Sequence, residues 1–98
     1  MSAYLVSVCE VTNKSDDLMS YAQQSAELIS KHGGAYIIRG PASEVLEGTH
    51  LQGKSLVIAQ FPNVDAIKEF WSSPEYLAFK SLREGTGIYD IGVFEGTE

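Results

Sequence analysis

AYLVSVCEV, residues 3–11, has apolar side chains at both of the alternating positions that an extended chain presents. Val8 points to one face of such a strand and Leu5 to the other, which is typical of a strand buried on both faces. SLVIAQF at residues 55–61 and GIYDIGVFEG at residues 87–96 have the same character. We therefore expect a β-sheet with apolar side chains on both of its faces.

Two helical segments lie between these strands. After capping and acidic residues at positions 13–17, apolar residues recur at helical spacing until the glycine pair at residues 33–34 ends the first helix. Asn63 is the expected N-cap of the second helix. Proline is tolerated at the first position of a helix and serine is a preferred cap, so Ser73 and Pro74 predict a joint between two helices.

Two short strand-like runs complete the pattern. AYIIRG at residues 35–40 and SEVLEG at residues 43–48 are separated by Pro41 and Ala42, which predicts a hairpin or a loosely turned pair. The order of elements is that of a ferredoxin-like β-α-β-β-α-β domain, an α+β fold in which right-handed crossovers place the helices on one face of an antiparallel sheet. We expect residues 1–98 to form a single domain of this kind.

Composition and charge argue against several classes of partner. The net charge of −6, from 13 acidic and 7 basic side chains, would repel the phosphates of a nucleic acid. No run approaches the roughly 20 apolar residues that span a bilayer, and the apolar start lacks the basic leading segment of a signal peptide. We therefore expect a cytoplasmic protein that binds neither nucleic acid nor membrane. The single cysteine, Cys9, cannot form an internal disulfide and is more simply interpreted as a small buried side chain than as a reactive thiol.

The second apolar face of the sheet predicts an oligomer. Helices can cover only one face, and an exposed face that is apolar along three strands would be unusually large for a monomer. A second copy packed face to face across a two-fold axis would cover it and would leave space for a small ligand between the sheets. We therefore predict a homodimer.

Beyond these patterns, the chain resembles a known family in the order and spacing of several short motifs. The motifs are the opening AYLVSVCEVTN, Gly33-Gly34 followed by Tyr36 and Ile38-Arg39-Gly40, Val45-Leu46-Glu47-Gly48, Phe61-Pro62, and Ser73-Pro74-Glu75-Tyr76 with Lys80 and Arg83. They are similar to a small bacterial family called domain of unknown function 1330. The resemblance implies a dimeric α+β barrel, in a superfamily that also contains cofactor-free quinone-forming monooxygenases and muconolactone isomerase-like enzymes. It implies no particular reaction, because the family has no agreed activity.

Three polar residues are candidates for catalysis. Arg39 shares a face of its predicted strand with Ile37, and its guanidinium could clamp a carboxylate or enolate oxygen. It could equally form an ion pair with Glu44 or Glu47 of the next strand. Glu47 is the candidate general base, because partial burial would raise its pKa, but it could also be solvated or salt-bridged. His50 could shuttle a proton, although any surface loop accommodates a histidine.

Aromatic and basic side chains are candidates for a ligand pocket. A pocket of tyrosines with one or two arginines would suit a small aromatic or carboxylated molecule, although most of these aromatic residues could equally belong to the core. The candidate ligand-binding residues are Tyr21, Tyr36, Trp71, Tyr76 and Arg83. The sequence has no histidine pair at metal-ligand spacing, no phosphate-binding glycine loop and no dinucleotide fingerprint, so we predict no metal and no cofactor.

Two classes of function remain open. The first is a cofactor-independent isomerase or monooxygenase that uses Arg39 as an electrophilic clamp and Glu47 or His50 as the proton carrier. The second is a non-catalytic binding or stress-related dimer in which the same arginine stabilises the barrel. A pocket between helices and sheet with Arg39 pointing into it would favour the first class, and a filled interior would favour the second.

Overall fold

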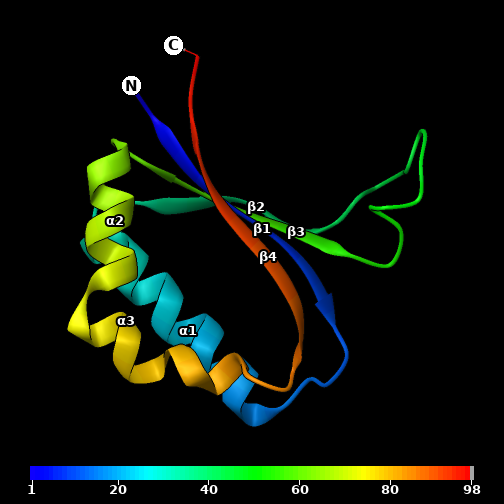
Figure 1. Cartoon of the computed structure of the whole chain (residues 1–98), viewed down its shortest axis with the longest axis horizontal. Coiled ribbons are helices and arrows are strands. Elements are labelled where there is room, and N and C mark those ends of the chain that lie inside the picture. The colour runs from blue at the N-terminus through cyan, green and yellow to red at the C-terminus, as the bar shows by residue number, and fades with distance from the viewer. Residues whose placement is uncertain (98) are drawn as a thin grey trace.

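The computed structural model describes residues 1–97 and has the predicted ferredoxin-like architecture. Its elements are β1 (Ala3–Val11), α1 (Asp16–Lys31), β2 (Ala35–Pro41), β3 (Ser55–Phe61), α2 (Val64–Ser72), α3 (Pro74–Phe79), the 3-10 helix η1 (Lys80–Arg83) and β4 (Gly87–Glu95). The strands form one antiparallel sheet in the order β2-β3-β1-β4, and the helices cover one of its faces (Figure 1). The predicted α+β fold class is therefore confirmed. No helix within residues 1–97 is long and apolar enough to cross a membrane.

The helix starts follow from local capping, as the sequence predicted. The side chains of Ser15 and Asn63 each accept a hydrogen bond from a backbone N–H in the first turn of α1 and α2, respectively. Ser73 ends α2 and caps α3, with Pro74 in the first helical position. The predicted joint is confirmed, and it allows the chain to change direction between α2 and α3.

The predicted strand at residues 43–48 is wrong. Residues 42–54 form an irregular connection that extends away from the sheet (Figure 1), and β2 pairs directly with β3. Leu46, in the middle of the predicted strand, is 88% exposed. The run at residues 43–48 has few apolar side chains, whereas β3 buries an apolar face beside β2, and burial of apolar surface decides which run becomes the partner.

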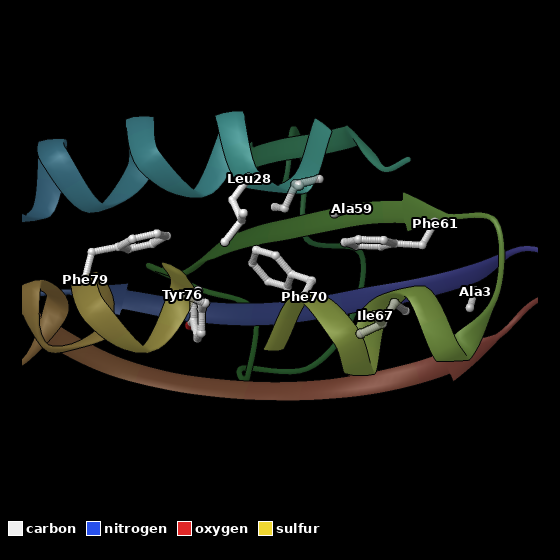
Figure 2. Packing of buried hydrophobic residues seen from close by; sticks show 9 residues of the cluster. Ala3, Leu28, Ala59, Phe61, Ile67, Phe70, Tyr76 and Phe79 are labelled. Carbon is white, nitrogen blue, oxygen red and sulfur yellow. The ribbon is translucent and has the colours of Figure 1, made fainter. Parts of the chain in front are cut away.

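The helix-facing side of the sheet carries the hydrophobic core. The largest fully buried side chains are Tyr76, Phe61, Phe70 and Ile67. In Figure 2 the rings of Phe61, Phe70, Tyr76 and Phe79 follow one another between the helices and the strands. Three of these four rings come from α2 and α3, so the direction of the chain at the α2–α3 joint determines how this side of the core is filled.

The opposite side of the sheet has no helix over it (Figure 1). The register pairs Val6 of β1 with Ile58 of β3 on this side, and the neighbouring strands β2 and β4 contribute Ile38, Ile88 and Phe94. Ile38, Ile88 and Phe94 are 45%, 61% and 57% exposed, respectively. The apolar second face that the sequence predicted is thus present, and we refer to it as the open sheet face.

Candidate functional site

A cavity of about 240 Å³ lies between the helix-facing side of the sheet and the helices. Its floor comes from all four strands, and its roof comes from α1 and from the chain around the α2–α3 joint. The wall is mainly apolar, with side chains such as Leu5, Ile29, Val57 and Ile91. Apolar cavities with a few well-placed polar groups are the usual binding sites for small molecules.

The five predicted ligand-binding residues all line this cavity. Each comes from a different element, so the fold brings together side chains that lie up to about sixty positions apart in the sequence. The five are Tyr21, Tyr36, Trp71, Tyr76 and Arg83. Arg39 also lines the cavity. The structure therefore assembles these residues around one space, while their role in binding stays a prediction.

Two tyrosine hydroxyls meet at the cavity wall. The hydroxyl oxygens of Tyr21 and Tyr76 are 2.8 Å apart and share one hydrogen bond. Tyr76 is fully buried because α3 packs its ring against Phe70, Trp71 and Phe79, at centroid distances of 4.9, 4.9 and 5.4 Å. Burial raises the pKa of Tyr76, and the hydrogen bond with Tyr21 raises it further. The Tyr76 hydroxyl is therefore neutral at physiological pH and serves as a hydrogen-bond donor or acceptor.

Arg83 lies beside this pair, and we call Tyr21, Tyr76 and Arg83 the tyrosine–arginine cluster. The guanidinium carbon of Arg83 lies 5.8 Å from the ring centroid of Tyr21 and 5.1 Å from that of Tyr89, within the range of cation–π attraction. Thr86 fixes the following turn, since its hydroxyl donates to the Arg83 carbonyl oxygen and accepts from the Tyr89 hydroxyl at 2.6 Å. The Nε of Arg83 is buried and has no hydrogen-bond partner among the described residues.

Arg39 lies at an exposed edge of the cavity, on the edge strand β2. The pairing of β2 with β3 shifts by one residue between Tyr36 and Ile38. Arg39 therefore shares the helix-facing side with Tyr36, because the regular alternation of β2 is broken at this irregularity. The guanidinium carbon lies 4.6 Å from the Tyr36 ring centroid. Burial raises the pKa of Tyr36, and the charge of Arg39 offsets part of that rise.

Glu47 and His50 lie outside the cavity. Both are exposed side chains of the 42–54 connection, and neither contributes to the cavity wall. The predicted ion pair between Arg39 and Glu44 or Glu47 required a neighbouring strand at residues 43–48, whereas Arg39 lies opposite Val57 of β3. The catalytic roles of Glu47 and His50 stay predictions. They require residues 42–54 to approach the cavity of the same or of a second copy.

The sequence-based prediction of the site did not include several polar side chains of the wall. Tyr89 was assigned only to a strand, although its alternation with Ile91 indicates the face that it occupies. Ser25 follows Tyr21 by four residues and so shares its helix face. It is 3% exposed, and its hydroxyl has no hydrogen-bond partner among the described residues. Cys9 is buried, as interpreted from the sequence, and its sulfur lies 3.1 Å from a serine hydroxyl of the same strand.

Comparison with solved structures identifies several proteins of similar fold. A protein of unknown function from Rhodopseudomonas palustris superposes with a TM-score of 0.76 at 15% sequence identity, over 99% of this chain and 83% of that chain. SnoaB from Streptomyces nogalater, described as a cofactor-independent oxygenase, gives 0.69 at 14% identity over 99% and 94%. A dimeric ferredoxin-like protein of unknown function from Jannaschia sp. CCS1 gives 0.73 at 11% identity over 98% and 100%. At these identities the likeness shows the fold alone.

Comparison by sequence identifies the family. No functionally curated protein matches the chain at a significant level. The motifs around residues 33–40, 61–62 and 73–76 indicated one family from the sequence, and the profile of that family matches nearly the whole chain. With residues 2–97 matched, the chain belongs to the family described as "Domain of unknown function (DUF1330)".

Proposed function

We propose that the protein binds a small aromatic or carboxylated molecule in the cavity between its helices and its sheet. The observation that carries this proposal is the apolar space of about 240 Å³ with the tyrosine–arginine cluster in its wall. An apolar cavity of about 150 Å³ holds a benzene molecule, so this space suits one substituted ring. The aromatic wall would contact the ring, and the hydroxyl and guanidinium donors would orient its polar group.

We also propose that the protein is a homodimer that buries the open sheet face. The exposed side chains of Ile38, Ile88 and Phe94 make this face apolar. Two proteins of similar fold, from Jannaschia sp. CCS1 and Thermobifida fusca, are described as dimeric. A second copy is the partner that the face suits best, because two identical apolar sheets bury each other by a two-fold rotation. A cytoplasmic location, predicted from the sequence, fits this proposal.

A cofactor-independent isomerase or monooxygenase is the catalytic form of the proposal. Arg39 would then clamp an oxygen of the substrate at the exposed edge of the cavity. The description of SnoaB as a cofactor-independent oxygenase supports this form by analogy of fold. Proton transfer by Glu47 or His50 requires residues 42–54 to approach the cavity of the same or the second copy. The binding proposal does not depend on that movement.

The test is a thermal-shift screen of small aromatic and carboxylic metabolites, followed by a structure with the strongest hit. A ligand present at 100 times its dissociation constant adds about 2.7 kcal/mol to the free energy of unfolding. Ala22 lines the cavity from α1, and Ala22→Phe would fill much of the space. Gln23→Phe places the same ring at an exposed position of the same helix and is the matched control.

The expected result is stabilisation of the wild type and of Gln23→Phe, with little stabilisation of Ala22→Phe. Equal stabilisation of all three proteins would show that the hits bind elsewhere and would remove the cavity from the proposal. Circular dichroism of both variants establishes that the fold is retained before the ligands are compared.

The second candidate function is a non-catalytic dimer in which Arg39 is structural. It is favoured by the contact of the Arg39 guanidinium with the Tyr36 ring and by the position of Glu47 and His50 outside the cavity. This candidate predicts that Arg39→Ala lowers the melting temperature substantially and that the screen gives no hit. An unchanged melting temperature for Arg39→Ala would exclude it.

A further inference from the structure

We infer that the molecule bound in the cavity is already an anion when it enters, and that its charged oxygen lies against the tyrosine–arginine cluster. The assignment rests on the proposed function, since it concerns the ligand of the same cavity. It narrows the class from aromatic or carboxylated molecules to small planar acids that are ionised at neutral pH, namely aromatic carboxylates and acidic phenols or enols.

The charges of the cavity wall favour an anionic ligand. The chain has 13 acidic and 7 basic side chains, yet among the described residues the charged side chains of the wall are two arginines, Arg39 and Arg83, with no aspartate, glutamate, lysine or histidine. Within the described part of this acidic protein, the charged groups of the cavity wall are therefore positive. Of the two, Arg83 is partly buried, and a bound anion would supply the counter-ion that the described wall does not contain.

Unused hydrogen-bond donors in the wall also favour an anionic ligand. The hydroxyls of Tyr21 and Tyr76 bring two protons, and their mutual hydrogen bond uses only one of them. The buried Nε of Arg83 and the buried hydroxyl of Ser25 have no partner within the described residues. Buried donors of this kind are rare and indicate an absent acceptor. An oxyanion accepts several hydrogen bonds at once, whereas a neutral carbonyl oxygen accepts fewer and weaker ones.

The described wall contains no carboxylate or imidazole that could act as a base. Burial raises the pKa of both Tyr36 and Tyr76, so these phenols keep their protons at neutral pH and do not act as bases. Cys9, which also lines the cavity, is hydrogen-bonded to Ser7. A ligand that needs its proton removed on arrival would find no carboxylate or imidazole to take it. The anion must therefore form in solution before binding.

The test compares ligands that have nearly the same shape but differ in charge. Benzoate and benzamide form one pair, and 4-nitrophenolate and 4-nitroanisole form a second, each titrated into the wild type by calorimetry at a pH above the acid's own pKa. Hydrogen bonds to a charged group are worth about 1.5–3 kcal/mol, so the anion of each pair should bind on the order of tenfold or more tightly. Arg83→Met should remove this preference, because it keeps the length of the side chain and deletes the charge. Arg83→Lys should restore part of the preference.

The outcomes separate this inference from the function on which it rests. Equal or tighter binding of benzamide and 4-nitroanisole would overturn the anion assignment and leave the cavity as a ligand site. Failure of all four probes to bind, with Ala22→Phe behaving as the wild type, would overturn the proposed function and the assignment together. The comparison of ligands uses the wild type, so it stands even where Arg83→Met does not fold.

Discussion

Ser73→Ala tests how the joint between α2 and α3 places Tyr76 in the site. The Ser73 hydroxyl is buried and makes two hydrogen bonds, accepting from the Tyr76 backbone N–H at 3.2 Å and donating to the Phe70 carbonyl oxygen at 2.8 Å. It therefore joins the last turn of one helix to the first turn of the next. Alanine has no group that can replace either bond.

The cost of Ser73→Ala follows from these two bonds. Loss of a serine N-cap costs about 1 kcal/mol, with a range of roughly 0.5–2. The Phe70 carbonyl oxygen keeps one donor, the Ser73 backbone N–H at 3.2 Å, so this acceptor is not left without a partner. The expected loss in the free energy of unfolding is therefore about 1–2 kcal/mol. For a domain of this size each 1 kcal/mol corresponds to a fall of roughly 4–8 °C in melting temperature.

The neighbouring Ser72 supplies a matched control. Its hydroxyl donates to the Lys68 carbonyl oxygen at 2.8 Å, but the side chain is exposed and, at the last residue of α2, caps neither helix. Ser72→Ala should change the free energy of unfolding by less than about 0.5 kcal/mol. The measurement is urea denaturation at one protein concentration, followed by circular dichroism and by the fluorescence of Trp71, the single tryptophan. Equal losses for the two variants would refute the capping role of Ser73.

Three further predictions follow from the sheet and from the buried phenol. Ile58→Asp places a charge in the middle of the open sheet face and should convert the dimer into a monomer in sedimentation experiments, whereas Met19→Asp on the exposed side of α1 should not. Because the pKa of Tyr76 is raised by folding, stability is full below the ordinary phenol pKa of about 10 and falls as pH rises beyond it, and Tyr76→Phe should flatten this fall in urea titrations at alkaline pH. Gly87→Ala should lower stability severely, because its Cβ would overlap the Glu10 carbonyl oxygen across the β1–β4 pair, and a variant that melts like the wild type would contradict this register.

Features that depend on neighbouring residues could be predicted from the sequence. The caps at Asn63 and Ser73 and the strand at residues 55–61 are set by a few adjacent positions, and the structure has all three where they were expected. The false strand at residues 43–48 and the common helix-facing side of Tyr36 and Arg39 have one shared explanation. Both depend on which strand pairs with β2 and in what register, and those are properties of packing between distant segments.

The site could be predicted only in its large side chains. Aromatic residues and arginines are visible as ligand-binding candidates, but the space that they surround is made by small residues. Ser7, Ser55 and Ala59 on the central strands, with Ala22 and Ser25 on α1, line the cavity at positions where a larger apolar side chain would close it. Small residues at such positions are equally compatible with close packing of the backbone, so their spacing carries no signal in the sequence.

The same small residues bear on whether the cavity serves a purpose. Apolar side chains that line an unfilled space make fewer packing contacts than those of a filled core, so a core that keeps this space is less stable than a packed one. A protein of 98 residues has a total stability of only about 5–15 kcal/mol. Replacing Ala22 by a larger apolar residue would recover part of that loss in a single step. A chain that keeps the space open, with the Arg83 Nε and the Ser25 hydroxyl unpaired among the described residues of its wall, is better explained by a ligand that fills the space than by the needs of folding alone.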